Sequence, residues 1–185
     1  LDSLSWYWIC LRSIRDIRHM RLPDFLVIGA MKAGTTSLCN DLASNSEIFF
    51  PSVKEPHTLV ARSFEKESHY KEYRKLFAAA EKDQLCGEGS TGYTKLHKFG
   101  RVPEKARKVI GKKAKILYIV RNPLDRIKSH HYQLYRKGEA KEDINEEVKL
   151  NGELVKISKY ASQIKPWIFE FGRERVKVLK FERYV

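Results

Sequence analysis

The stretch that decides the fold is residues 24–38, DFLVIGAMKAGTTSL. It opens with an apolar run at residues 25–28, which lacks polar alternation and is typical of a strand buried on both faces of a parallel sheet. Gly29 and Gly34 then bracket a loop that carries Lys32. The stretch therefore predicts a buried strand that runs into a glycine loop.

A helix follows this loop directly. Leu38 and Leu42 keep helical spacing, and the predicted first turn holds three hydroxyl residues, Thr35, Thr36 and Ser37. The free N–H groups of a helix N-terminus and the positive end of its dipole attract anions. The strand, the loop and the helix start together predict a cradle for a phosphate or a sulfate.

Strand-like and helix-like segments alternate along the rest of the chain. Residues 85–90, 115–120 and 176–181 fit strands, of which KILYIV at 115–120 is the clearest buried one. Helices are predicted at 70–80, at 103–111, from Asn122 and Pro123 onward, and at 154–171 with a kink at Pro166. Residues 138–152 are charged and are predicted to be a flexible excursion. The pattern predicts an α/β fold, a three-layer sandwich with a mainly parallel central sheet and a P-loop-like strand–loop–helix.

Composition limits the class of protein. The chain has 185 residues, of which 42% are hydrophobic, which suits one domain with a sizeable core. The formal net charge of +13 favours polyanionic partners, namely nucleic acid, acidic glycans, nucleotides or anionic membrane, without choosing among them. Three cysteines without a CxxC pair indicate neither a disulfide framework nor a metal site. No apolar run reaches membrane-spanning length, and no signal peptide is visible.

The sequence divides into two parts. Residues 1–22 predict a basic amphipathic helix, and residues 23–185 predict the α/β domain. Such a helix can lie on a membrane surface, but packing on the domain or on a neighbour is the favoured interpretation. Because the chain starts without methionine and stops after a predicted strand, we expect a fragment that is truncated at the C-terminus. An anchor upstream of it stays open.

The spacing of the two loop glycines is that of the nucleoside-triphosphate P-loop. That motif ends in Gly-Lys-Ser/Thr, whereas here Thr35 follows Gly34 and the lysine, Lys32, lies inside the loop. A lysine and hydroxyls at these positions still suit a phosphate oxygen. A P-loop nucleotide or small-molecule kinase, which predicts magnesium-dependent ATP binding, is therefore a disfavoured alternative.

Four stretches resemble one family. GAMKAGTTSL at 29–38 is similar to the 5′-phosphosulfate loop of sulfotransferases that use 3′-phosphoadenosine-5′-phosphosulfate (PAPS), and ILYIVRNPLDRIKSHHYQ at 116–133 to their 3′-phosphate-binding strand and helix. VKEPH at 53–57 and GEGSTGY at 87–93 resemble segments of the glycan-type and bacterial members. The resemblance runs from about Pro23 to the end. It implies PAPS as donor, 3′-phosphoadenosine-5′-phosphate (PAP) as product, and no metal.

The resemblance also implies which residues bind the nucleotide. Lys32 would neutralise the charge that grows on the 5′-phosphate side as the sulfuryl group leaves. Arg121, at the carboxyl end of a strand, and Ser129 would bind the 3′-phosphate. The full set of implied nucleotide-binding residues is Lys32, Ala33, Gly34, Thr35, Thr36, Ser37, Arg121 and Ser129.

Transfer to a hydroxyl needs a base. Glu55 is the first candidate, because the resembling family has its catalytic carboxylate in this loop, and His57 is the second, because histidine titrates nearest neutral pH. The catalytic set implied is thus Glu55, Lys32 and His57. The chain departs from some relatives at Gly89, where they have a lysine, and at Thr58 and Leu59, where they have an aromatic pair.

We therefore expect a PAPS-dependent sulfotransferase that acts on the hydroxyl of a carbohydrate or another hydroxylated metabolite. The alternative from another class is a non-catalytic polyanion-binding module, which predicts steep salt dependence and indifference to PAP. A nucleic-acid partner is not expected, since the positive residues are dispersed and match no known motif. The acceptor and the oligomeric state stay open. The bacterial-type motifs and the lack of an export signal favour the cytoplasm.

Overall fold

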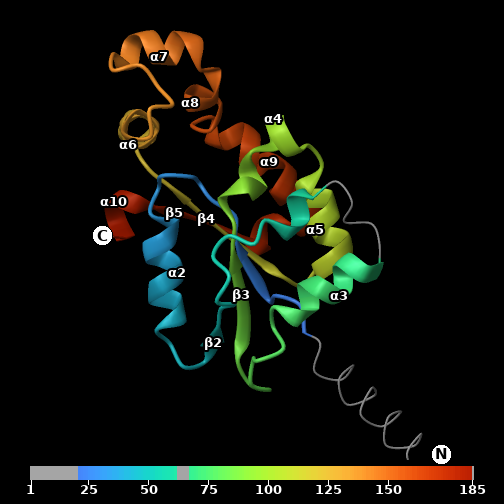
Figure 1. Ribbon diagram of the computed structural model, residues 1–185. Coiled ribbons are helices and arrows are strands. Elements are labelled where there is room, and N and C mark those ends of the chain that lie inside the picture. The colour runs from blue at the N-terminus through green and yellow to red at the C-terminus, as the bar shows by residue number, and fades with distance from the viewer. Residues whose placement is uncertain (1–20, 62–66, 185) are drawn as a thin grey trace, which may run out of the picture.

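The computed structural model describes residues 21–61 and 67–184 of the chain. At its centre lies a five-stranded sheet in the order β2-β3-β1-β4-β5 (Figure 1). All four neighbouring pairs are parallel, which confirms the predicted α/β class and exceeds the expectation of a mainly parallel sheet. The strands are β1 Phe25–Val27, β2 Ile48–Phe49, β3 Leu85–Gly89, β4 Lys115–Val120 and β5 Val176–Lys180.

Helices connect these strands, as parallel pairing requires. The α-helices are α2 Thr35–Ala43, α3 Glu67–Lys75, α4 Leu96–Phe99, α5 Val102–Ile110, α6 Pro123–Arg136, α7 Ile144–Leu150, α8 Gly152–Lys156, α9 Tyr160–Phe171 and α10 Phe181–Tyr184. Three 3₁₀ turns are η1 Thr58–Val60, η2 Thr91–Thr94 and η3 Arg173–Arg175.

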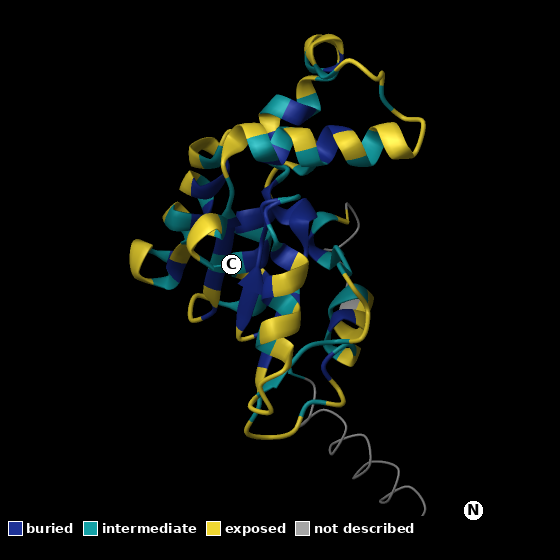
Figure 2. Ribbon diagram, turned by 90° about the vertical axis from the view of Figure 1, so that its left-hand side faces the viewer, coloured by how far each residue is buried: buried dark blue, intermediate teal, exposed yellow. Residues whose placement is uncertain are grey.

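Helices cover both faces of the sheet, which makes three layers. Successive side chains of a strand point to opposite faces, and Leu26 and Val27 of β1 are both fully buried. Leu26 packs with Trp167 of α9 in one core cluster, whereas Val27 packs with Leu38 of α2 in the other. In Figure 1, α2 lies on one side of the sheet and α3, α5 and α9 lie on the other. Figure 2 shows the strands buried and the outer helix faces exposed.

The central position of β1 decides where the loops meet. β1 lies between β3 and β4, so the loops after these three strands open at the same edge of the sheet. Backbone hydrogen bonds tie the start of two of these loops to the neighbouring strand, from the Ala30 N–H to the Ile119 carbonyl of β4 at 2.6 Å and from the Ser90 N–H to the Val27 carbonyl of β1 at 3.0 Å. In open parallel sheets the carboxyl edge is where ligands bind.

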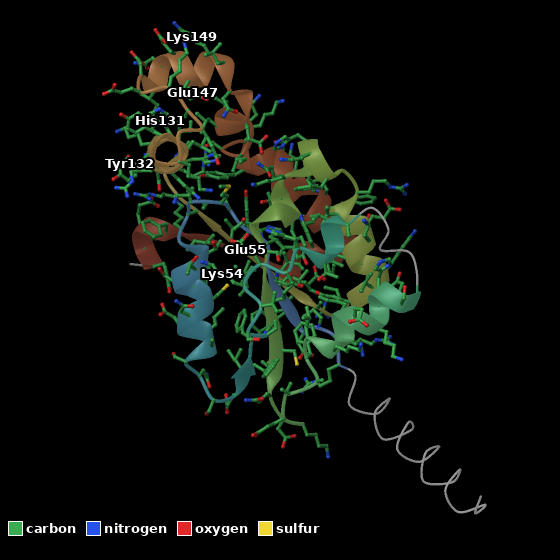
Figure 3. The ribbon with its side chains drawn as sticks, in the orientation of Figure 1. Lys54, Glu55, His131, Tyr132, Glu147 and Lys149 are labelled. Atoms are coloured by element: carbon green, nitrogen blue, oxygen red, sulfur yellow. The ribbon has the colours of Figure 1, made fainter. Side chains whose placement is uncertain are left out.

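The prediction of a flexible excursion at 138–152 was wrong, since α7 and the start of α8 lie there. Asp143 caps α7 by accepting the Asn145 N–H at 2.6 Å, and this local bond stabilises the helix start. Glu147 is buried on the side of α7 near His131 of α6 (Figure 3) and accepts the Lys141 N–H at 3.0 Å. Buried contacts between α6 and α7, which the local charge pattern does not reveal, thus order the segment.

Helix breaks also differ from expectation at 154–171. The helical structure is interrupted at residues 157–159, between α8 and α9, whereas α9 continues through Pro166. A proline removes one backbone hydrogen bond. However, Trp167 and Phe171, which follow Pro166 in α9, are fully buried, and their rings stack with centres 5.7 Å apart. Their packing keeps the helix in place around the proline.

The predicted N-terminal helix lies almost entirely outside the described residues, because residues 1–20 are not among them. In the part that is described, no helix has both the length and the apolar character that crossing a membrane would require. Cys39 and Cys86 are free thiols.

Candidate functional site

A polar cleft of about 610 Å³ opens at the carboxyl edge of the sheet. It contains nearly all residues that the sequence singled out, although they come from distant segments. The predicted residues that line it are Lys32, Gly34, Thr35, Thr36, Ser37, Glu55, His57, Arg121 and Ser129. Ala33 is the exception, since it is fully buried beneath the loop and its N–H donates to the Ala30 carbonyl at 3.1 Å.

The loop after β1 presents backbone donors to this cleft. Gly34 has φ 90° and precedes α2 without any side-chain cap. Within the described part of the chain, the N–H groups of Thr35, Thr36 and Ser37 have no acceptor, and the first helical bond runs from the Leu38 N–H to the Gly34 carbonyl. A Cβ at residue 34 would lie 2.6 Å from the Phe181 ring, so only glycine fits. Three free donors at a helix N-terminus form an anion cradle.

Three residues of the cleft have a left-handed backbone although they are not glycine. They are Lys32 with φ 67°, Glu55 with φ 48° and His57 with φ 53°, and no other non-glycine residue among those described has a positive φ. This conformation is uncommon for residues with a Cβ and concentrates at functional sites. All three are residues that sequence reasoning named as catalytic candidates.

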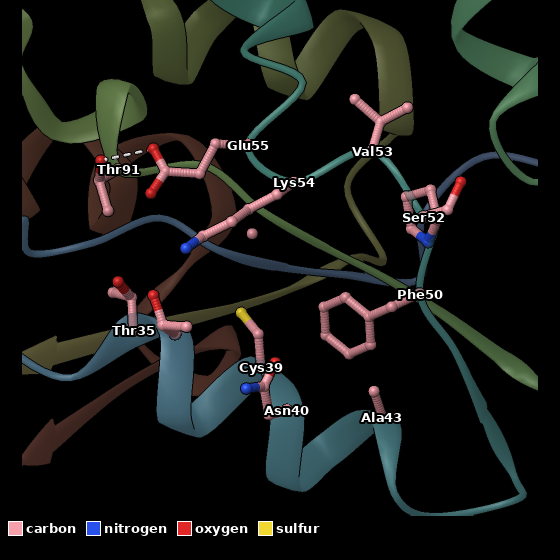
Figure 4. A pocket seen from close by; sticks show the side chains of 13 residues that line it. Thr35, Cys39, Asn40, Ala43, Phe50, Ser52, Val53, Lys54, Glu55 and Thr91 are labelled. Carbon is pink, nitrogen blue, oxygen red and sulfur yellow. Dashed lines mark hydrogen bonds between the residues drawn. The ribbon is translucent and has the colours of Figure 1, made fainter.

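One of the two carboxylate oxygens of Glu55 is held by neighbouring side chains. Thr91 Oγ1 donates to its Oε2 at 2.8 Å (Figure 4). His57 Nε2 lies 3.1 Å from the same oxygen. No side chain among the described residues donates a hydrogen bond to Oε1. The hydrogen bond from His57 and then that from Thr91 lower the pKa of Glu55, against the effect of burial. Glu55 is therefore ionised at neutral pH with one oxygen free in the cleft.

His57 has only one ring nitrogen near this carboxylate. Its Nδ1 is buried without a hydrogen-bond partner in the described structure. This nitrogen faces Gly92, where an added Cβ would lie only 2.7 Å from it. Because Nδ1 is enclosed and Nε2 is occupied by Glu55, the imidazole is placed to orient Glu55, and the oxygen of Glu55 is the better placed proton acceptor.

A buried carboxyl group supports this loop from below. Glu88 of β3 is fully buried and accepts hydrogen bonds from Ser90 Oγ at 2.7 Å, from Tyr93 OH at 2.6 Å and from Tyr73 OH. Burial raises its pKa. Ser90 Oγ also accepts the backbone N–H of His57 at 3.1 Å, which connects Glu88 to the loop. Sequence reasoning missed this network, although the polar residues of GEGSTGY were its signal.

The other end of the cleft holds Arg121 and Ser129. The Arg121 guanidinium lies 4.9 Å from the centre of the Phe181 ring, and its carbonyl accepts the Tyr160 OH at 2.8 Å. Asn122 caps α6 by accepting the Leu124 N–H at 3.0 Å, as predicted. Ser129 comes from α6 and faces the same cleft. The strand end, the cap and the helix together place these two side chains.

Two further lysines line the cleft, and sequence reasoning gave neither a role in it. They are Lys54, which directly precedes Glu55, and Lys95, which lies in a segment without a motif. Burial lowers the pKa of Lys95. Within residues 21–61 and 67–184, neither lysine forms an ion pair. They add positive charge to the lining of the cleft.

A second cavity joins the cleft at Glu55. It measures about 290 Å³, lies between α2 and residues 50–55 (Figure 4), and shares five lining residues with the cleft. These are Thr35, Thr36, Lys54, Glu55 and Thr91. Glu55 therefore lies at the boundary between the two spaces.

Comparison with known proteins finds a matching family model and a similar solved structure. A family model described as a sulfotransferase domain matches residues 22–185. Among solved structures, the chain is similar to a sulfotransferase from Alicyclobacillus acidocaldarius, with 26% identity, a TM-score of 0.76, and coverage of 89% of this chain and 75% of that chain. No curated protein matches the sequence.

Proposed function

Because this chain belongs to the sulfotransferase domain family, we propose that it transfers a sulfuryl group from PAPS to an acceptor hydroxyl, on a carbohydrate or another hydroxylated metabolite. The observation that carries this proposal is that two groups of residues suited to bind anions line one cleft. The helix N-terminal cradle with Lys32 is at one end, and Arg121 with Ser129 is at the other.

The residues present fit a nucleotide with phosphates at both its 5′ and 3′ positions. The free N–H groups of the α2 start and Lys32 suit the 5′ side, whereas Arg121 and Ser129 suit the 3′-phosphate. Lys32 and Arg121 form no ion pair within the described residues, so both charges are available. The volume of about 610 Å³ is within the range of roughly 300–1,000 Å³ that small-molecule sites occupy.

The proposed reaction is a single displacement at sulfur. The acceptor oxygen forms a bond to sulfur while the bond between sulfur and the bridging oxygen of PAPS breaks. Glu55 Oε1 accepts the proton of the acceptor hydroxyl. Lys32 stabilises the negative charge that develops on the 5′-phosphate side, where a positioned cation is most effective. The products are the sulfated acceptor and PAP, with the proton on Glu55.

Titration calorimetry with PAP, ADP and 5′-AMP tests the nucleotide part. We expect PAP to bind at least about tenfold more tightly than the other two, because only PAP carries the 3′-phosphate that a charge-assisted pair can hold. Arg121→Ala should remove this preference, whereas Arg136→Ala, an exposed control at the end of helix α6, should not. Equal affinities for the three nucleotides in the unchanged protein would overturn the assignment. Preferred binding of magnesium ATP would favour a kinase instead.

A further inference from the structure

The cavity beside Glu55 differs in character from the nucleotide cleft. Beyond the five shared residues, its lining contains no charged side chain, and most of its surface is apolar. The residues that line only this cavity are Cys39, Asn40, Ala43, Phe50, Pro51, Ser52, Val53 and Gly89. The cleft, in contrast, carries Lys32, Lys95 and Arg121 on its own walls. One space is thus suited to an anion and the other to a neutral molecule.

Two side chains on opposite walls of this cavity, Phe50 and Cys39, have close packing contacts. Phe50 packs edge to face on the core residue Phe25, with the ring centres 5.6 Å apart, so its ring forms a firm apolar wall. Cys39 of α2 is opposite (Figure 4), and a Cβ at Gly89 would lie 2.5 Å from its sulfur. Burial raises the pKa of Cys39 to about 11, so this thiol adds no charge at neutral pH. Asn40 supplies a neutral hydrogen-bonding group.

We propose that this cavity is the acceptor site, and that it selects an uncharged alcohol or phenol with an apolar body of one or two rings. The proposal rests on the proposed function, because it names the acceptor that Glu55 would deprotonate. The hydroxyl lies at the Glu55 boundary, where the cavity meets the sulfuryl donor, and the body extends along α2 toward Ala43.

The size of the cavity sets the size of the acceptor. Thr35 and Ala43, at the two ends of α2, are both in its lining. Eight helical steps at 1.5 Å each separate them by about 12 Å along the axis. The volume of about 290 Å³ is at the small end of the range for ligand sites. The residues that line only this cavity include no cation, so a carboxylate on the acceptor body would lose hydration against the Phe50 ring without gaining a charged partner. Acidic glycans are therefore poor candidates.

A matched pair of acceptors tests this charge selection. 4-Methylphenol and 4-hydroxybenzoate have the same ring and hydroxyl and differ by one carboxylate at the far end. With PAPS as donor, we expect kcat/KM for 4-methylphenol to exceed that for 4-hydroxybenzoate by about tenfold or more. N-acetylglucosamine and a sulfated disaccharide serve as carbohydrate probes. Transfer to a carbohydrate with none to either phenol would overturn the inference and leave the proposed function standing.

Substitution of Ala43 should change the acceptor preference, and a gain of activity toward a new acceptor cannot result from misfolding. Ala43 is exposed and ends α2, where a cation interacts favourably with the helix dipole. Ala43→Lys should shift the preference toward 4-hydroxybenzoate, and Ala43→Trp should raise KM for 4-methylphenol about tenfold or more. Ser44→Trp, next along the chain and outside the cavity lining, is the control. An unchanged acceptor preference in both Ala43 variants would overturn the inference.

PAP affinity distinguishes a failure of the proposed function from a failure of the acceptor assignment. The Ala43 variants should bind PAP as the unchanged protein does, since Ala43 does not line the nucleotide cleft. If the unchanged protein fails to bind PAP, the proposed function fails. If PAP binds, but 4-methylphenol neither accepts the sulfuryl group nor inhibits its transfer to an acceptor that does, only the acceptor assignment fails.

Discussion

Glu55 Oε2 and His57 Nε2 lie 3.1 Å apart, and both residues have a left-handed backbone. Pro56 between them is the only residue that separates the pair, so two unusual backbone conformations bring the two side chains together. Thr91 holds the same oxygen from the strand side at 2.8 Å. The result is a carboxylate with a fixed orientation and one free oxygen at the junction of two cavities.

Glu55→Gln should abolish most of the turnover while leaving PAP binding intact. The amide keeps the shape and one acceptor oxygen but cannot take up a proton, so we expect kcat to fall by about 10²- to 10⁴-fold. Steady-state kinetics and PAP calorimetry on the same preparation check this. Glu139→Gln, at an exposed position after α6, is the control. A kcat within about threefold of the unchanged protein would assign the base elsewhere.

The pH profile should report the hydrogen bonds to Glu55. The bonds from His57 and Thr91 lower the pKa of Glu55 in the folded protein, so kcat/KM should decrease with falling pH only below the usual range of a glutamate. Thr91→Val removes one of these bonds and should move the acid limb to higher pH. His57→Ala should move it further, because His57 is the larger cause. A shift toward lower pH in either variant would contradict this assignment.

The same linkage predicts a stability effect with a defined sign. A carboxyl group whose folded pKa is lowered stabilises the protein above its unfolded pKa, and this contribution is lost as the pH falls through the folded pKa. We expect Glu55→Gln to reduce the pH dependence of the urea unfolding midpoint between neutral pH and the range below pH about 4.5. The partly exposed site makes the effect small. An increased pH dependence in the variant would show that Glu55 is not the group responsible.

Ser90→Ala should separate positioning from binding. The hydroxyl donates to Glu88 at 2.7 Å and accepts the His57 N–H at 3.1 Å. Its loss leaves buried polar groups unsatisfied, which costs about 1–3 kcal/mol in unfolding free energy. Because the His57 backbone loses its anchor, kcat should also fall while PAP affinity stays unchanged. Ser44→Ala, an exposed hydroxyl, is the control. A stability loss with unchanged kcat would assign Ser90 to structure alone.

Lys32→Met should lower kcat more than it weakens PAP binding. The charge on the bridging oxygen develops during the reaction, so a cation there contributes chiefly to the transition state, and we expect a loss of about 10²- to 10³-fold in kcat. Arg121→Ala should instead act mainly on nucleotide affinity. Measuring kcat and PAP affinity for both variants checks the contrast. Equal losses of both quantities in the two variants would contradict separate roles.

Local patterns explain which parts of the site were predictable. The cradle follows from residues 24–38 alone, because a strand, a glycine loop and a helix start are adjacent in the chain. Arg121 was predictable as a strand end, and Asn122 as a cap. These features depend on backbone signals within a few residues. The fold class was predictable for the same reason, since alternating strand and helix signals imply parallel pairing.

Features that depend on contacts between distant segments were not predictable. Glu88 has an ordinary sequence context, and only the packing of α3 and η2 around β3 shows that Tyr73 and Tyr93 enclose it. Leu124, an apolar residue of α6, is 67% exposed, whereas the polar residues Arg126 and His130 occupy the buried face of this helix. A guanidinium on that face is compatible with burial because Ser158 Oγ accepts from its Nε at 2.6 Å. The spacing of residues along a helix reveals neither the tyrosines that enclose Glu88 nor the contact of Arg126 with Ser158.

Gly92→Ala should displace His57 and thereby change the chemistry of Glu55 without a direct contact to it. The new Cβ would lie 2.7 Å from His57 Nδ1, closer than real contacts allow, so the ring must move. Movement of the ring lengthens the 3.1 Å contact between His57 Nε2 and Glu55, which removes the largest cause of the lowered Glu55 pKa. The acid limb of kcat/KM should therefore shift to higher pH, as in His57→Ala, and the double variant should show no further shift. Gly152→Ala, where the nearest atom to the new Cβ is the Lys156 Cε at 3.9 Å, is the control. Additive shifts in the double variant would mean that Gly92 acts through another path.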